Sequence, residues 1–242
     1  HINCGIAGLV AAMVVGKRSG DSYTYAPHNL IYTLVGAALL WVGWFGFNAG
    51  SALAANEKAG NAMLVTQIAT AAAALSWMFV EWIIKGKPTV VGIATGMVAG
   101  LATITPAAGT VGPEGALLIG LMVGIVCYYA TQAIKGVFGI DDSLDVFPVH
   151  GVGGMLGIIL ISFVGTPGGF LGSGASGIAD GGPMVQLVIQ LKGILVIGLW
   201  TAVASWVILK LVGLVTDLRV SEESENEGLD VTEHEERSYD LT

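Results

Sequence analysis

Long apolar stretches recur along this chain, and they constrain its fold more than any other feature. A helix needs roughly 20 mostly apolar residues to cross the hydrocarbon core of a bilayer. Six stretches approach or exceed that length, at residues 30–55, 61–84, 88–106, 114–134, 144–165 and 184–216. Only 12% of the residues are charged, about half the share in a soluble domain. These features predict an all-α polytopic membrane protein and exclude a soluble enzyme or a nucleic-acid binder.

The first apolar run, residues 1–16, is shorter than a membrane span. At 1.5 Å per residue it covers about 24 Å, less than the roughly 30 Å hydrocarbon core. It starts without a methionine or a basic signal-peptide region. We therefore expect the sequence to begin partway through a helix.

The positions of the basic residues predict the orientation. Alternate connections between the apolar stretches carry nearly all of them: Lys17, Arg18, Lys85, Lys87, Lys135 and Arg219, against Lys58 alone in the others. Because cytoplasmic loops of membrane proteins are enriched in Lys and Arg, we expect these connections and the C-terminus to be cytoplasmic.

The charge also divides the chain into two parts. Residues 217–242 hold ten acidic and two basic residues, which accounts for the whole net charge of −8. We therefore predict a transmembrane domain at 1–216 and an acidic cytoplasmic tail at 217–242. An acidic tail is often only a solvated segment, so its composition alone leaves a regulatory role open.

Glycines at four-residue spacing mark expected helix contacts. Gly92, Gly96 and Gly100 form one stripe, and Gly120 and Gly124 form another on the next span. Small residues at this spacing let membrane helices approach closely, so we interpret both stripes as packing seams. The two cysteines, Cys4 and Cys127, show no spacing typical of a disulfide framework or a metal site.

Two histidines, His1 and His150, stand inside apolar runs, where an ionisable group is a functional hypothesis by default. Each is followed by glycines four and seven positions later, which suggests an internal repeat. The alternative is two separately satisfied core histidines. Counted along helices, His150 lies about 13 Å beyond Asp141 and His1 about 24 Å beyond Lys17. They meet only if the first helix projects into the cytoplasm or the helix of His150 starts deeper.

The span 30–55 carries a stripe of Trp44, Phe47 and Ser51 on one helical face, with Asn48 beside it. Core packing is the simpler interpretation. A pore wall is the functional one, because aromatic faces and a hydroxyl can hold a small cation.

Two acids near span ends have structural interpretations. Asp145, before the His150 helix, is expected to be a helix N-cap. Glu81 is expected to reach the membrane interface.

The chain as a whole closely resembles the ammonium transporter (Amt/Rh/MEP) family, on the Amt side. The matching segments are collinear over essentially all 242 residues: His1-Ile2-Asn3 to Gly16-Lys17-Arg18, Pro27-His28-Asn29-Leu30, Gly43-Trp44-Phe45-Gly46-Phe47-Asn48-Ala49-Gly50-Ser51, Gly86-Lys87-Pro88, Ile104-Thr105-Pro106-Ala107, Asp145-Val146-Phe147, Val149-His150-Gly151 and Glu227-Gly228-Leu229-Asp230.

The resemblance implies a bundle of eleven helices built as inverted five-helix repeats, assembled as a homotrimer with one pore per subunit. This chain would run from the second half of helix five to helix eleven and the tail, so most of the N-terminal repeat, with its intramembrane aspartate, would precede residue 1. The resemblance implies a cell-membrane transporter or channel for nitrogen uptake, not an enzyme, with no cofactor and no metal.

Site roles follow from the resemblance by position. His1 and His150 would be the paired pore histidines, Ser51 part of the external ammonium site and Phe47 a gate beneath it. Trp44 and Val146 would be apolar pore lining.

The tail resembles a regulatory C-terminus that contacts neighbouring subunits and PII-type signal proteins. Gly228, Asp230 and Thr232 would take part in that regulation, and Thr232 resembles a phosphorylated threonine of plant members.

Ammonium would be recruited outside and deprotonated, and ammonia would pass the two histidines while the proton travels separately. Two alternatives remain open: an ammonium sensor on the same scaffold and an Rh-like channel for neutral ammonia.

Overall fold

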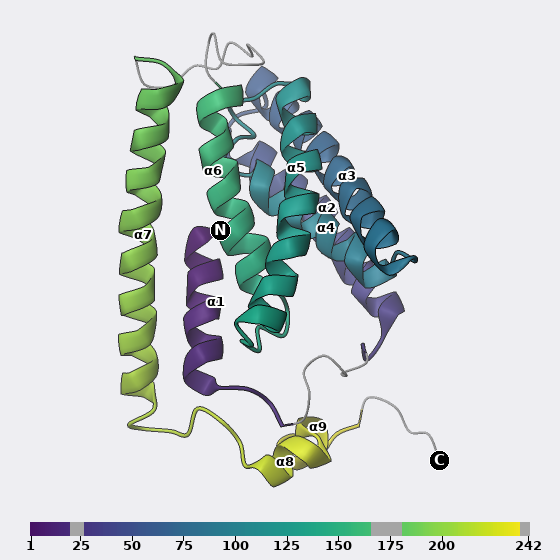
Figure 1. Cartoon of the computed structure of the whole chain (residues 1–242), viewed down its shortest axis with the longest axis vertical. Coiled ribbons are helices and arrows are strands. Elements are labelled where there is room, and N and C mark those ends of the chain that lie inside the picture. Colours follow the sequence, from purple (N-terminus) through teal and green to yellow (C-terminus); the bar gives the residue numbers. More distant parts are fainter. Residues whose placement is uncertain (20–26, 166–180, 238–242) are drawn as a thin grey trace.

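The computed structural model describes residues 1–19, 27–165 and 181–237, and every regular element within them is a helix (Figure 1). The elements in chain order are α1 (Ile2–Val15), α2 (Leu30–Gly50), α3 (Glu57–Lys85), α4 (Val90–Ile104), α5 (Pro113–Gln132), η1 (Ala133–Val137), η2 (Phe147–Val152), α6 (Gly153–Val164), α7 (Pro183–Val212), α8 (Glu222–Glu227) and α9 (Leu229–Thr232). The two η elements are short π-helices that extend α5 and begin α6.

Each of the six predicted apolar stretches forms a helix. Five helical segments of the described chain are long and apolar enough to cross a membrane: 30–50, 57–85, 113–137, 147–164 and 183–212. The stretch 88–106 gives the 15-residue α4, which is shorter than predicted. Its helix ends at Ile104, and Pro106 two residues later has no backbone N–H to continue the hydrogen-bond ladder.

Helix α3 packs most extensively of all against α4 and α5. The predicted glycine seams are confirmed, because added Cβ atoms would meet α3. On α4, a Cβ at Gly96 would lie 2.6 Å from the Cβ of Trp77. On α5, one at Gly120 would overlap the carbonyl oxygen of Ala69. The absence of side chains on these two stripes lets three helix backbones approach closely.

Helix α1 packs between η2 and α7 (Figure 1). At its contact with η2, a Cβ on Gly5 would overlap the backbone nitrogen and Cα of Gly151, and one on Gly154 would lie 3.1 Å from the Cβ of His1. These glycines belong to the pattern that follows both histidines. The repeated pattern therefore marks the crossing of the two helices that carry the histidines.

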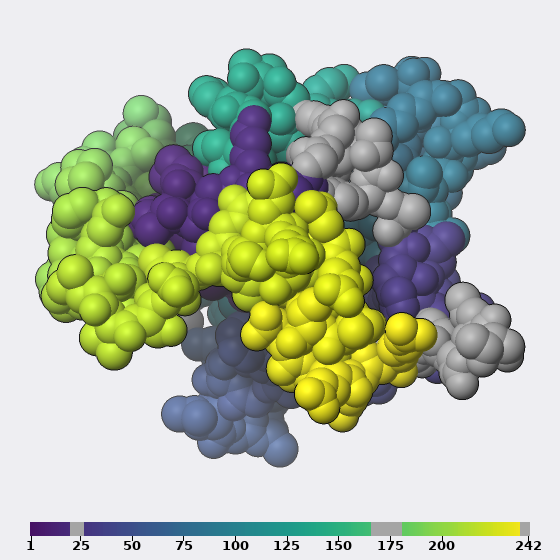
Figure 2. Space-filling view, turned by 90° about the horizontal axis from the view of Figure 1, so that it is seen from below, coloured from purple at the N-terminus to yellow at the C-terminus, as the bar shows by residue number. Residues whose placement is uncertain are grey.

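The C-terminal tail folds back under the bundle. Figure 2, seen from below, shows it lying across the end of the molecule beside the segment that follows α1. Glu225 of α8 accepts a hydrogen bond from the Ser19 backbone N–H at 2.7 Å and pairs with Arg219 at 2.7 Å. The tail is thus attached to the bundle by specific contacts, at the same end as Lys17 and Arg18.

Asp142, not Asp145, caps the helix that carries His150, so the predicted N-cap was wrong. The carboxylate of Asp142 accepts hydrogen bonds from the backbone N–H groups of Val146 and Phe147, at 3.0 and 2.7 Å. Asp145 has a positive φ of 55° and its carboxylate pairs with Lys135 at 2.8 Å. Because Asp145 has this left-handed conformation, the carboxylate of Asp142, three residues earlier in the chain, lies next to the first backbone N–H groups of the helix.

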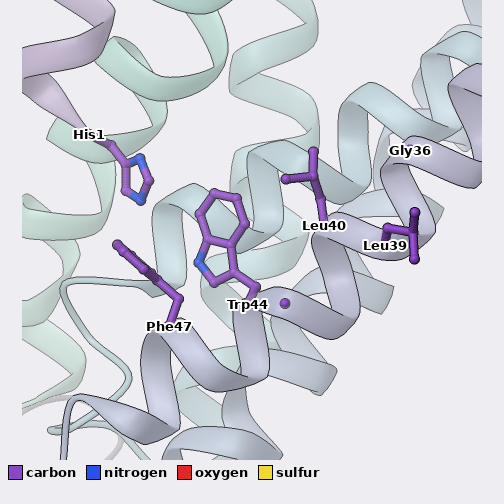
Figure 3. A pocket seen from close by; sticks show the side chains of 7 residues that line it. His1, Gly36, Leu39, Leu40, Trp44 and Phe47 are labelled. Atoms are coloured by element: carbon purple, nitrogen blue, oxygen red, sulfur yellow. The ribbon is translucent and has the colours of Figure 1, made fainter.

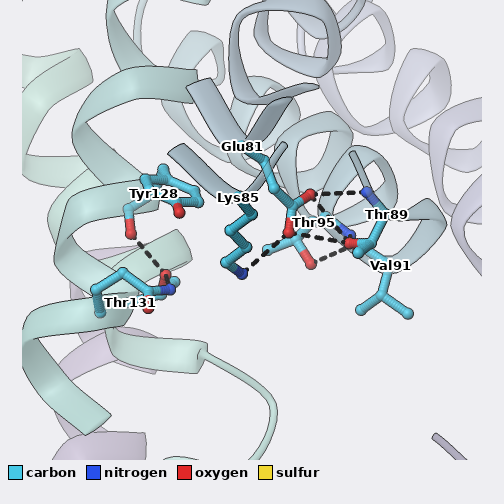
Figure 4. Close-up of polar contacts among 9 residues, drawn as sticks. Glu81, Lys85, Thr89, Val91, Thr95, Tyr128 and Thr131 are labelled. Carbon is cyan, nitrogen blue, oxygen red and sulfur yellow. Dashed lines mark hydrogen bonds and ion pairs between the residues drawn. The ribbon is translucent and has the colours of Figure 1, made fainter. Parts of the chain in front are cut away.

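Glu81 is buried within the protein, and its expected reach to the membrane interface stays a prediction. It is 3% exposed and accepts hydrogen bonds from the N–H and hydroxyl of Thr89, at 2.9 and 3.0 Å (Figure 4). Lys85 pairs with its other oxygen at 3.1 Å. Thr89 is the N-cap of α4, so this carboxylate links the end of α3 to the start of α4.

Replacing Glu81 with leucine should lower the free energy of unfolding in detergent by about 3 kcal/mol, because Thr89 loses two hydrogen bonds to a charged acceptor. Lys85 is 47% exposed, so its ion pair adds little. Glu57→Leu, at an exposed position on the same helix, should cost at most about 1 kcal/mol. Equal losses in the two variants would contradict the bridging role of Glu81.

A second polar link gives the fold a pH dependence. The Arg18 guanidinium donates to both oxygens of Asp141 at 2.8 Å and holds the pKa of that carboxyl below its usual value. The contribution of this ion pair to the free energy of unfolding is complete above the unfolded pKa of about 3.9. It is lost as the pH falls through the lower folded pKa. Between pH 6 and pH 3, the Tm of Asp141→Asn and of Arg18→Gln should therefore fall less than that of the unmodified chain. Equal slopes in all three proteins would contradict this.

Candidate functional site

The two intramembrane histidines meet inside the bundle. His1, at the N-terminus of α1, and His150, in η2, place their Nδ1 atoms 3.2 Å apart, with ring centroids separated by 5.3 Å. One Nδ1 must carry a hydrogen and the other accept it, so the pair shares one proton. Helix α1 extends below the lower ends of α5 and α6 (Figure 1), and its projection into the cytoplasm stays a prediction.

A π-helix carries His150, whose imidazole contacts His1 of α1. The segment Phe147–Val152 has i→i+5 hydrogen bonding, which is rare and is often found at functional sites. No sequence signal for it was recognised.

Aromatic rings from α2 continue the stack of imidazoles. Trp44 lies nearly parallel to His1, with centroids 5.2 Å apart and planes 23° apart, and Phe47 lies 6.0 Å from the same imidazole (Figure 3). The indole N–H of Trp44 donates to the Thr105 hydroxyl at 2.8 Å, which fixes the ring. Thr105 is a residue that sequence reasoning did not single out as positioning.

Two apolar cavities flank the histidine pair. The first, of about 540 Å³, is lined by His1, Gly36, Leu39, Leu40, Gly43, Trp44 and Phe47. The second, of about 310 Å³, is lined by His150 together with residues of α2, α4 and η2, including Gly36, Leu40, Val98 and Val149. Each histidine therefore borders one of two open pockets.

Gly36 and Leu40 line both cavities. Both were missed in the sequence, although they lie on the same helical face as Trp44 and Phe47. Extending that stripe by two turns would have found them.

Ser51 borders a separate and more polar cavity beyond Phe47. This space of about 220 Å³ is also lined by Asn48, Lys58 and Thr105. The Ser51 hydroxyl donates to the Phe47 carbonyl at 2.7 Å, so its lone pairs stay available as acceptors. Lys58 is the basic residue of this cavity and opposes the entry of cations electrostatically.

Val146 packs on α1, where a Cβ at Gly8 would lie 2.9 Å from its Cγ1. Its expected place in a pore wall remains a prediction.

The three tail residues singled out earlier lie together in one turn. Gly228 separates α8 from α9 with a φ of 114°, a conformation that favours glycine. The Thr232 hydroxyl donates to the Gly228 carbonyl at 3.1 Å, and Asp230 lies between them in α9. Residues 238–242 of the predicted tail lie outside the described part.

The amino-acid sequence matches a known family over nearly its whole length. The family model described as "Ammonium Transporter Family" matches residues 1–239. The chain belongs to the ammonium transporter family. A curated "Ammonium transporter" of Aquifex aeolicus is 48% identical over 241 residues, which cover 100% of this chain and 55% of that protein. This membership confirms the resemblance drawn from the sequence motifs.

Solved structures related to the ammonium transporter family share the fold. Saccharomyces cerevisiae Mep2 aligns with a TM-score of 0.80 and 36% identity, covering 92% of this chain and 53% of that one. A structure named "Sensor Amt Protein" aligns with a TM-score of 0.86 and 31% identity, covering 96% and 57%. The helical membrane transporter fold is therefore confirmed. The chain spans about half the length of the curated relatives it matches.

Proposed function

We propose that this chain forms the histidine-bearing part of an ammonium transport pore. The observation that carries the proposal is the contact between His1 and His150, each of which also lines a mostly apolar pocket. A proton-sharing pair at this place offers one donor and one acceptor to a small polar solute. The Nε2 atom of His1 is buried and has no hydrogen-bond partner among the described residues, so it is available for that contact.

Selectivity follows from the cost of charge in an apolar passage. An unpaired cation without water is strongly disfavoured, and a titratable cation responds by losing its proton. Ammonium can become ammonia, whereas potassium, an ion of similar size, cannot shed its charge. In this proposal ammonium enters near Ser51 and deprotonates at the aromatic layer of Phe47 and Trp44. Ammonia then passes the histidine pair while the proton moves separately.

The acceptor oxygen of Ser51 supports its role in recruiting the cation, and Lys58 opposes it. Dissolved salt screens the repulsion between Lys58 and an ammonium ion next to the hydroxyl. Recruitment of ammonium should therefore weaken when the salt concentration is lowered. Val146 and Trp44 line the passage in this proposal.

The wider assembly is proposed on the same basis. The transmembrane domain, residues 1–216, lies in the cell membrane with the acidic tail in the cytoplasm, because the basic connections favour that side. The chain assembles as a homotrimer. Gly228, Asp230 and Thr232 regulate the pore through the tail, which contacts a PII-type signal protein.

The test is reconstitution in liposomes. Because the chain spans about half of its relatives, it is joined to the part of the Aquifex protein that precedes the match, and ammonium-evoked current is recorded with potassium as a comparison. A current with ammonium and none with potassium supports the proposal. Ammonia flux without current would instead indicate a neutral gas channel. No flux of either kind would contradict a transport function.

An ammonium sensor is the second candidate, favoured by the structural match to the protein named "Sensor Amt Protein". The tail contact between Glu225 and Ser19 could transmit a change in the bundle. A sensor would bind ammonium in the same liposomes without turnover.

A further inference from the structure

A thiol lies next to the two histidines, although the sequence spacing does not show it. Cys4 stands one helical turn after His1 on α1, is exposed, and its S–H donates to the His1 carbonyl at 3.2 Å. One ligand atom from each of His1, Cys4 and His150 lies within 4.8 Å of the other two. The separation of 149 positions between the histidines hides this cluster from any search for short metal-binding motifs.

The spacing of the two nitrogens suits a tetrahedral ion. Atoms 3.2 Å apart subtend an angle of about 100° at an ion roughly 2.0–2.1 Å from each, close to the tetrahedral angle. A small rotation of both rings would aim their lone pairs at that point. The Cys4 sulfur must turn away from the His1 carbonyl and approach to about 2.3 Å. A fourth position then stays open toward the apolar cavity.

We propose that His1, Cys4 and His150 form a binding site for a thiophilic divalent cation, with Zn²⁺ the best fit. Imidazole and thiolate are ligands of zinc, whereas Mg²⁺ and Ca²⁺ prefer oxygen. The thiol proton leaves to solvent. The proton on the donor Nδ1 is replaced by one on Nε2 of the same ring, so both rings stay neutral. One proton is released per ion bound, and affinity falls about tenfold for each unit of decreasing pH.

The site is tested with Co²⁺ as a spectroscopic probe of the purified chain in detergent. We expect visible bands of a tetrahedral ion, a sulfur-to-cobalt charge-transfer band in the near ultraviolet, and loss of both when Zn²⁺ is added. Cys4→Ser should lose the charge-transfer band and bind at least tenfold more weakly, and His150→Asn should weaken binding similarly. Cys127→Ser, a change at a buried cysteine, should keep the full spectrum.

Two results would overturn the site. One is an unchanged cobalt spectrum in Cys4→Ser, with circular dichroism showing that the variant is folded. The other is loss of the spectrum when two residues are added before His1, which would assign the ligand to the α-amino group of the chain.

A functional consequence rests on the proposed transport activity: Zn²⁺ should block ammonium current, and Cys4→Ser should remove the block. The two proposals fail separately. A cobalt spectrum without any flux overturns transport and leaves the site standing, whereas flux without the charge-transfer band overturns the site alone.

Discussion

Replacing His150 with leucine is expected to reduce ammonium-evoked current at least tenfold or to open the passage to potassium. Leucine has a similar volume but no donor or acceptor, so it breaks the 3.2 Å contact with His1 and leaves one imidazole without a partner for its proton. Current and the ammonium-to-potassium selectivity ratio are measured in liposomes containing the joined protein. Either change shows that the pair governs what passes.

The matched control is His234→Leu, which alters an exposed histidine of the tail. It should keep both current and selectivity. If His150→Leu conducted ammonium with unchanged current and selectivity, the pair would be a packing feature and the proposed passage would be wrong.

Adding one methyl group at Gly5 should disable the site without replacing either histidine. A Cβ there overlaps the nitrogen and Cα of Gly151, so α1 and η2 must separate. His1 and His150 sit on these two elements, and a separation of even one ångström breaks a hydrogen bond of 3.2 Å. We expect Gly5→Ala to lower ammonium current at least tenfold and to lower the free energy of unfolding by about 1–3 kcal/mol.

Gly46→Ala provides the comparison. Gly46 lies on α2, and a Cβ at that position meets nothing within 4 Å. Its current should match that of the unmodified protein, and helix propensity should make it slightly more stable. The Gly5 interpretation fails if both alanine variants behave alike.

Much of the fold could be predicted from the sequence, because its strongest signals are local. Apolar length located the helices, and four-residue glycine spacing located the faces that meet α3. The early end of α4 was missed because Pro106 lies within an apolar run and does not lower its hydropathy. The misassigned cap has a similar origin: Asp142 and Asp145 both precede the helix, and a positive φ at Asp145 decides which carboxylate faces its start.

The site was predicted in part. The residues His1, His150, Trp44 and Phe47 do come together, as the shared glycine pattern and the aromatic stripe suggested. The sequence could not supply the relative depth of the two histidines in the bundle. Counting residues along ideal helices placed them at different depths. The cluster with Cys4 also depends on a contact between residues far apart in the chain, which no local pattern encodes.

The Nδ1-to-Nδ1 geometry has a consequence for repeated turnover. A proton that enters at Nε2 of His1 and leaves from Nε2 of His150 exchanges the tautomers of both rings. The relay is then set to run backwards, and a second forward transfer requires ring rotation or a returning proton. In the proposed transport, such a relay moves a single proton and must be reset before it can move the next one.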